Sequence, residues 1–151
     1  MKTKIIVDTN IVFSAILKPS GNIGKILIFP KRQVQFYSCD FLKTELLKHR
    51  LKLLDLSKLT AEKLDEVELL LTKNIIFINE GLLPAEIVFP TKEILADVDV
   101  HDTPFVALTK YLQGKLWTGD KVLIRGLERN GSFVETLTTT QVYSILDDLK
   151  N

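Results

Sequence analysis

The stretch IIVDTNIVFSAIL, residues 5–17, decides how the chain begins to fold. Its opening residues are apolar and β-branched, which is typical of a buried strand. The strand stops at the carboxylate of Asp8, and a helix-like apolar run, residues 10–17, starts almost at once. A charge between two segments that both favour burial needs a reason. Asp8 either caps the helix or is one of several carboxylates gathered around a metal ion.

The bulk composition is that of an ordinary globular protein, and we expect a single domain spanning residues 1–151. Hydrophobic residues make up 46% and charged residues 26%, which allows a sizeable core. The one cysteine, Cys39, cannot form an internal disulfide, which fits a reducing compartment. No apolar run approaches the roughly 20 residues that a membrane helix needs. We therefore expect a soluble, cytoplasmic protein that does not contact a membrane.

The charge is balanced overall but unevenly distributed. The net charge of +1 gives no indication of a polyanionic partner, yet residues 1–60 hold 11 basic and 4 acidic side chains. This basic part either contacts phosphate groups or forms a solvated helix face. The candidate phosphate contacts are Lys18, Lys25, Lys31, Arg32, Lys43, Lys48, Arg50, Lys52 and, outside this part, Lys121.

Strand-like and helix-like segments alternate along the chain. The predicted strands are residues 4–7, 34–38, 75–78, 115–118 and 133–137. The predicted helices are residues 10–17, 23–29, 40–56, 61–73, 84–96 (one or two helices, broken near Pro90), 103–113, 120–129 and 139–150. This order predicts an α/β fold, a three-layer sandwich with a mainly parallel central sheet.

Four acids are placed where such a sheet would gather them. Asp8 ends the first strand, and Asp120 follows the strand at 115–118. Asp102 begins the helix that leads into that strand, and Glu45 lies early in the helix after the strand at 34–38. Clustered carboxylates repel one another unless a cation is present, and Mg²⁺ and Mn²⁺ prefer oxygen ligands. The four positions together therefore indicate a metal site.

Each acid also has a plausible local role. Asp8, Asp102 and Asp120 all occupy positions where an aspartate caps a helix. Glu45 is placed to pair with Lys48 or His49 on the next turn. Only the convergence of all four positions favours a shared site over these local roles.

Three blocks of the chain resemble the PIN domain family. IIVDTNIVFSAIL is similar to the family's opening, in which an aspartate ends strand one and a Thr/Ser-Asn pair follows. FLKTELLKH resembles the second block, and DVDVHDTPFVALTKYLQGKLWTGDKVL the third, with an Asp-x-x-Asp pair and a Thr/Ser-x-Asp-Lys turn. The nearest variant is the bacterial or archaeal toxin-component type. One departure is Thr109, where the helix usually has alanine; we expect it to be a packing position.

The resemblance implies a PIN-like fold and a metal-dependent endoribonuclease that hydrolyses single-stranded RNA with Mg²⁺ or Mn²⁺. It implies catalytic and metal-binding roles for Asp8, Glu45, Asp102 and Asp120, with Asp99 assisting at the metal and Asn10 and Thr118 lining the pocket. It also implies a homodimer and, for toxin members, a protein antitoxin. The apolar residues of the segment 60–73 are candidates for the partner surface.

Two other classes of function stay open. The first is a catalytically silent PIN-like module that binds RNA or protein, although intact acids at all four positions argue against it. The second is a phosphoryl-transfer α/β domain. A haloacid-dehalogenase-type phosphatase needs D-x-D after strand one, whereas this chain has D-T-N, residues 8–10.

Overall fold

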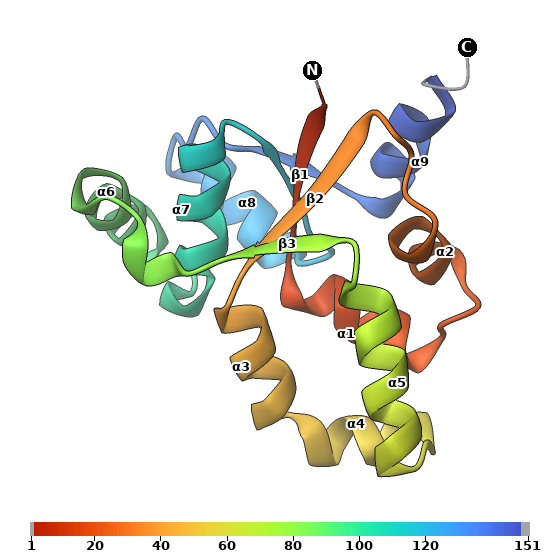
Figure 1. Cartoon of the computed structure of the whole chain (residues 1–151). Coiled ribbons are helices and arrows are strands. Elements are labelled where there is room, and N and C mark those ends of the chain that lie inside the picture. The colour runs from red at the N-terminus through yellow and green to blue at the C-terminus, as the bar shows by residue number, and fades with distance from the viewer. Residues whose placement is uncertain (1, 149–151) are drawn as a thin grey trace.

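The computed structural model describes residues 2–148, which form an α/β fold around one parallel sheet (Figure 1). The sheet has five strands in the order β3-β2-β1-β4-β5, and all four pairings are parallel. The strands are β1 (Thr3–Val7), β2 (Val34–Cys39), β3 (Ile75–Ile78), β4 (Lys115–Trp117) and β5 (Glu135–Leu137). The predicted fold class is therefore confirmed, and within the described residues the sheet is wholly parallel.

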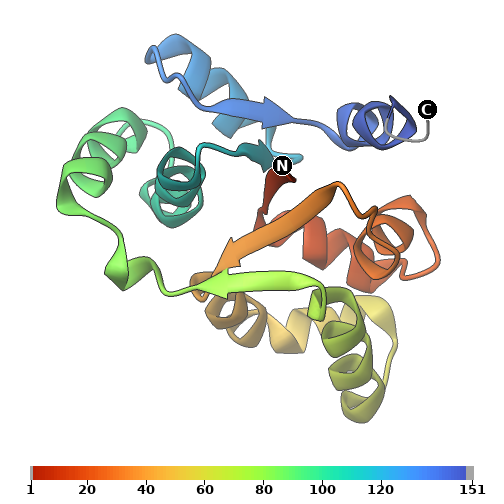
Figure 2. The ribbon, with the colours of Figure 1, turned by 45° about the horizontal axis from the view of Figure 1, so that its top comes forward.

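Helices connect the strands and cover both faces of the sheet. The helices are α1 (Thr9–Leu17), α2 (Asn22–Ile28), α3 (Phe41–Lys48), α4 (Arg50–Ser57), α5 (Ala61–Thr72), η1 (Glu80–Leu82), α6 (Ala85–Leu95), η2 (Val100–Asp102), α7 (Thr103–Leu112), α8 (Lys121–Arg129) and α9 (Thr139–Asp148). Figures 1 and 2 show α7 and α8 on one side of the sheet and α1, α2 and α9 on the other. Within residues 2–148, no single helix is long and apolar enough to span a membrane, although the bent pair α1 and α2 together meets that criterion.

The core lies on both faces of the central strands. Ile5, Ile6 and Val7 of β1 are fully buried, as expected for a strand covered by helices on each side. Five consecutive residues of α7, Phe105–Thr109, are also buried, because this helix packs between the sheet and α6. Thr109 is buried, and its hydroxyl donates to the Phe105 carbonyl at 2.7 Å. A helix can satisfy a threonine hydroxyl in this way, so the departure at Thr109 is at a packing position, as predicted.

Two predicted helices differ from the structure. The segment 40–56 forms two helices, α3 and α4, which meet at His49. The bend lets α4 pack on α1 and bury Leu53. The segment 84–96 contains one continuous helix, α6, with Pro90 inside it. Pro90 is exposed, so water can replace the backbone hydrogen bond that proline removes.

Candidate active site

The sheet reverses its strand order at β1, which pairs with β2 on one side and with β4 on the other. In open parallel sheets, ligands bind beyond the carboxyl ends of the strands at this switch point. Asp8 follows β1, and its backbone N–H donates to the carbonyl of Trp117, the last residue of β4, at 3.1 Å. The residues that follow β1 and β4 therefore lie side by side.

Asp8 is buried at this place, with 4% of its surface exposed. One carboxylate oxygen accepts the Thr9 N–H at 2.8 Å, and the other accepts the Thr118 hydroxyl at 2.7 Å. Burial raises the pKa of Asp8 to about 6, and the carboxylates of Glu45 and Asp120 contribute to the rise against these two hydrogen bonds. Asp8 thus caps α1 locally and is also coupled to other acids.

Thr118 connects Asp8 to the turn after β4. Its hydroxyl oxygen accepts from the Asp120 N–H at 3.1 Å and from the Asn10 side-chain amide at 3.5 Å. The Asn10 side-chain oxygen in turn accepts the Gly119 N–H at 3.3 Å. Asn10 and Thr118, the two predicted pocket-lining residues, therefore lie beside the acids and fix the turn that carries Asp120.

Asp120 has the predicted capping role as well as a place in the cluster. Its Oδ1 accepts the N–H groups of Val122 at 3.0 Å and Leu123 at 3.1 Å, which caps α8. Both bonds go to the same oxygen, so capping does not require the other one. A cap and a metal ligand are compatible functions of this single carboxylate.

Glu45 is connected to the site by Thr9, a residue for which the sequence predicts no role. The Thr9 hydroxyl donates to a Glu45 carboxylate oxygen, which connects the start of α1 to α3. Within residues 2–148, neither Lys48 nor His49 forms an ion pair with Glu45, so the alternative of a surface pair is not seen. The sequence signal for Thr9 was its position next to Asp8 in the Thr-Asn pair.

Asp102 differs from Asp8 and Asp120 because its side chain does not cap a helix. It occupies the position before α7, but its side chain makes no capping hydrogen bond, so the capping alternative is wrong for this residue. Its Oδ2 atom is buried and has no hydrogen-bond partner. Burial, followed by the carboxylates of Asp8, Asp99, Asp120 and Glu45, raises the pKa of Asp102 to about 8. Like charges exert this effect at short range, so all five acids belong to one cluster.

The oxygen atoms of this cluster suit a hard divalent cation, and the unpaired Asp102 oxygen is an available ligand. Asp99 lies at the edge of the cluster, where it accepts the His101 N–H at 2.9 Å and contacts the His101 ring at 3.1 Å. No group of three or more His, Cys, Asp or Glu side chains among residues 2–148 lies at the spacing that holds one ion directly. The carboxylates of the cluster would hold such a cation, and Mg²⁺ usually keeps several waters when it binds.

The predicted phosphate contacts do not all lie near the acids. Lys121 follows Asp120 directly, and Lys43 and Lys48 are exposed on α3 with Glu45. The Lys43 Nζ atom lies 4.1 Å from the centroid of the Phe77 ring, and the Lys52 Nζ atom lies 5.8 Å from the centroid of the Phe13 ring.

The other basic residues lie elsewhere. Lys18 is at the far end of α1, about 15 Å from Asp8 at the rise of an α-helix, and Lys25 is on the following helix. Lys31 and Arg32 precede β2 and so lie at the opposite edge of the sheet. Arg50 pairs with Asp65 at 2.8 Å and fastens α4 to α5, which occupies its guanidinium.

This fold and site define a parallel α/β protein with an acidic cluster at its switch point. The sequence profile of the PIN domain family matches residues 6–145. The chain belongs to the PIN domain family, which confirms the resemblance. No curated protein matches the chain. Among solved structures, a chain in the crystal structure of VapBC2 from Rickettsia felis bound to a DNA fragment from their promoter is similar, with a TM-score of 0.63 and 15% identity over 90% of this chain and 98% of that chain.

Proposed function

We propose that this protein is an endoribonuclease of the cytoplasm that hydrolyses phosphodiester bonds of single-stranded RNA with Mg²⁺ or Mn²⁺. PIN domains are in general nucleases, and the acidic cluster is the observation that carries the proposal. One member, Asp102, has an unpaired buried oxygen and a pKa raised to about 8 by burial and four neighbouring acids. Neighbouring carboxylates repel one another, and a bound cation would remove that repulsion.

The residues that would hold the cation are Asp8, Glu45, Asp102 and Asp120, with Asp99 at the edge of the site. When bound, such an ion lowers the pKa of water and neutralises charge that develops on phosphate. In the proposed reaction, water would form a bond to phosphorus as the bond to the 3′ oxygen breaks, and the proton that water loses would be balanced by the one that the leaving 3′ oxygen gains. The products carry a 5′-phosphate and a 3′-hydroxyl, and no 2′,3′-cyclic phosphate forms.

The surrounding residues orient this machinery. The Thr118 and Thr9 hydroxyl groups each donate to a carboxylate, Asp8 and Glu45 respectively, which fixes the remaining acceptor directions of both acids. Lys43, Lys48 and Lys121 are the best-placed contacts for phosphates of the bound strand. Because each exposed lysine that contacts phosphate releases counterions, their removal should weaken RNA binding and flatten its salt dependence.

The decisive test is a digest of unstructured RNA by purified protein with Mg²⁺ or Mn²⁺, with chelator, and with two site variants. Asp8→Asn and Asp120→Asn remove charges that hold the cation, so each should lower cleavage by more than about 100-fold, a larger loss than is usual for residues that only hydrogen-bond to the ligands. The matched control is Asp55→Asn, because the Asp55 side chain is 80% exposed on α4. Its rate should equal that of wild type.

Two results would contradict the proposal in different ways. Cleavage that survives both chelator and Asp8→Asn would show that another nuclease or another mechanism is responsible. A folded wild-type protein that binds RNA but cleaves none in either metal would instead favour the silent binding module.

We further propose that the protein is the toxin of a toxin–antitoxin pair. The similar VapBC2 structure supports a protein partner.

We also propose that the protein is a homodimer. Its surface offers apolar side chains for association with a second chain, because Leu47, Leu51 and Leu69 are 72%, 83% and 70% exposed on α3, α4 and α5. A hollow of about 430 Å³ runs between α3 and α5 and includes Leu47 and Leu69 in its lining. Exposed apolar surface of this kind marks association sites.

A further inference from the structure

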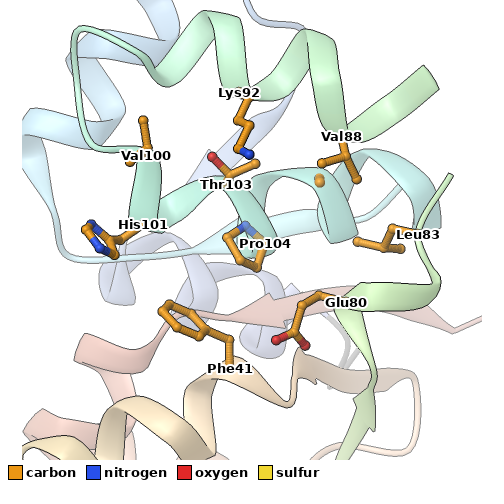
Figure 3. Close-up of a pocket in the computed structure, with 10 residues that line it drawn as sticks. Phe41, Glu80, Leu83, Val88, Lys92, Val100, His101, Thr103 and Pro104 are labelled. Carbon is orange, nitrogen blue, oxygen red and sulfur yellow. The ribbon is translucent and has the colours of Figure 1, made fainter. Parts of the chain in front are cut away.

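Two hollows outside the acidic cluster differ in the chemistry of their walls. The first, of about 250 Å³, lies between α3, α6 and α7 and is lined mainly by apolar side chains, among them Phe41, Val88 and Pro104 (Figure 3). The second, of about 360 Å³, is lined by four cationic side chains, Lys2, Lys31, Arg32 and Lys73. Of the residues 2–148 that line this second hollow, none is acidic. We call it the basic hollow, because all its charged side chains have the same sign.

The basic hollow lies at the edge of the sheet opposite the acidic cluster. Lys2 precedes β1 and Lys73 precedes β3, while Lys31 and Arg32 precede β2 between them. Because the three strands are parallel, these residues share the amino-terminal edge. Lys2 and Asp8 lie at the two ends of β1, about 20 Å apart at the rise of a strand. Charges at physiological ionic strength are screened within about 8 Å, so the acids do not neutralise the basic hollow.

Hydrogen bonds hold the backbone around the basic hollow in place. The Thr3 N–H donates to the Gln33 carbonyl at 2.7 Å, which joins the start of β1 to the loop before β2. The Asn74 side-chain nitrogen donates to the carbonyls of Leu27 and Ile28, each at 3.2 Å, which joins the loop before β3 to the end of α2. The cationic side chains are therefore carried by segments that are fastened to one another.

Within residues 2–148, none of the four cationic side chains of the basic hollow forms an ion pair. Arg50 differs from them, because it pairs with Asp65 at 2.8 Å. Like charges that share one hollow repel one another. A bound anion would remove this repulsion, and four cations from three segments match an anion with several negative charges in a row.

We propose that the basic hollow binds the phosphate backbone of the RNA substrate, several nucleotides away from the bond that is cleaved. The inference rests on the proposed function. The Arg32 guanidinium suits a phosphate group, which it can bind through two parallel N–H bonds. Consecutive phosphodiesters supply the row of negative charges. At about 3.4 Å per stacked nucleotide, roughly six nucleotides cover the length of β1, so only a longer strand reaches both the basic hollow and the acids.

The first test is equilibrium binding of a labelled all-uridine dodecamer in chelator, where no metal-dependent cleavage occurs. The double variant Lys31→Gln/Arg32→Gln should weaken binding about tenfold, because two phosphate contacts are lost. It should also lower the slope of log affinity against log salt by about 1.4, since each contact to a single strand contributes about 0.7. The matched control is Lys58→Gln/Lys63→Gln, which removes the same charge from two exposed side chains near α4 and α5. It should leave affinity and slope unchanged.

The second test shows whether the basic hollow and the acids bind one strand together. With Mn²⁺, Lys31→Gln/Arg32→Gln should raise the KM for the dodecamer about tenfold, in line with the lost contacts, and leave kcat unchanged. This pattern is expected when the lost interaction contributes equally to the ground state and the transition state. A trinucleotide is too short to reach both places, so its kcat/KM should be the same for the variant and the wild type.

The outcomes separate this inference from the proposed function. Wild type that cleaves RNA in Mn²⁺, with a double variant that binds the dodecamer equally well, would overturn the basic hollow as an RNA site and leave the nuclease standing. Weakened binding by the double variant, in a protein that cleaves no RNA, would support the basic hollow and overturn the nuclease. An equal loss in the Lys58→Gln/Lys63→Gln control would show general charge attraction only. Tighter binding of inorganic tripolyphosphate than of the dodecamer would assign the basic hollow to a small anion. Either of these last two results would overturn the inference.

Discussion

Asp102 and Asp8 belong to the same acidic cluster but differ in how their carboxyl groups are satisfied. Both oxygens of Asp8 accept hydrogen bonds, from Thr9 and from Thr118. An amide at Asp8 would place an NH₂ group against a Thr118 oxygen that already accepts from two donors. Asp102 has an oxygen without a partner. Substitution of Asp102 therefore removes charge with little other change, and Asp102 is the better probe of repulsion.

The first prediction concerns the pH dependence of stability in chelator. The pKa of Asp102 is about 8 in the folded protein and 3.8 when unperturbed. The folded state therefore binds more protons than the unfolded state between pH 4 and 8, and the free energy of unfolding falls as pH rises through this window. The Tm of wild type should fall from pH 5 to pH 8, and that of Asp102→Asn should fall less.

The measurement is thermal unfolding at constant ionic strength, with and without metal. A difference of 1 kcal/mol shifts Tm by roughly 2–4 °C in a protein of this size, which is readily resolved. Added Mg²⁺ or Mn²⁺ should restore wild-type stability at pH 8, because a ligand that binds only the folded state stabilises it. Parallel Tm curves for the two proteins would show that Asp102 carries no unfavourable charge.

Helix α2 shows how a tertiary contact overrides local helix propensity. Gly24 lies inside this helix, where alanine is ordinarily more favourable than glycine by about 1 kcal/mol. A Cβ atom at Gly24 would lie 2.0 Å from the carbonyl oxygen of Pro19 and 2.8 Å from its carbonyl carbon. Both atoms are backbone, so neither can rotate away.

The second prediction is therefore that alanine at position 24 lowers the free energy of unfolding, although alanine ordinarily stabilises a helix relative to glycine. Gly24→Ala should destabilise the protein by about 1–3 kcal/mol, the usual cost of overpacking, measured by denaturant unfolding. The control is Lys25→Ala on the exposed side of the same helix, with an effect within about 0.5 kcal/mol. A stabilised Gly24→Ala variant would mean that α2 can move away from Pro19.

The elements that could be predicted from sequence are those set by local patterns. The strand before Asp8 and the helix at 61–73 are both predicted by local pattern, and in the structure Thr60 caps this helix by accepting the Lys63 N–H at 3.2 Å. The bend at His49 and the continuity of α6 through Pro90 depend on what each helix packs against, so local pattern could not settle them. The same distinction applies to the site. Asp8 and Asp120 follow strands, whereas the hydrogen bond from Thr9 to Glu45 joins two helices that are far apart in sequence, and spacing along the chain does not predict it.

The helices α3, α4 and α5 lie beyond the carboxyl end of β2 (Figure 1), where α4 and α5 pack against α1 and α5 also packs against α2. Their inner residues Leu53, Leu64 and Leu71 are fully buried and belong to the same hydrophobic core as β1 and α1. The outer leucines of these helices lie outside that core and are exposed. This division is expected of a unit that presents an apolar surface to a second chain.

The last prediction is that this surface forms the proposed homodimer. Wild type should show a mass near twice 17.1 kDa by light scattering at high micromolar concentration. Leu69→Lys should shift the protein towards the monomer mass, because a buried unpaired charge is costly at an interface. Phe133→Lys is the matched control, since Phe133 is fully exposed in the loop before β5, and it should leave the mass unchanged. A wild-type monomer at this concentration would count against self-association. The exposed leucines would then be the proposed contact for the antitoxin. In that case, adding the antitoxin should slow hydrogen exchange of the backbone amides of α5.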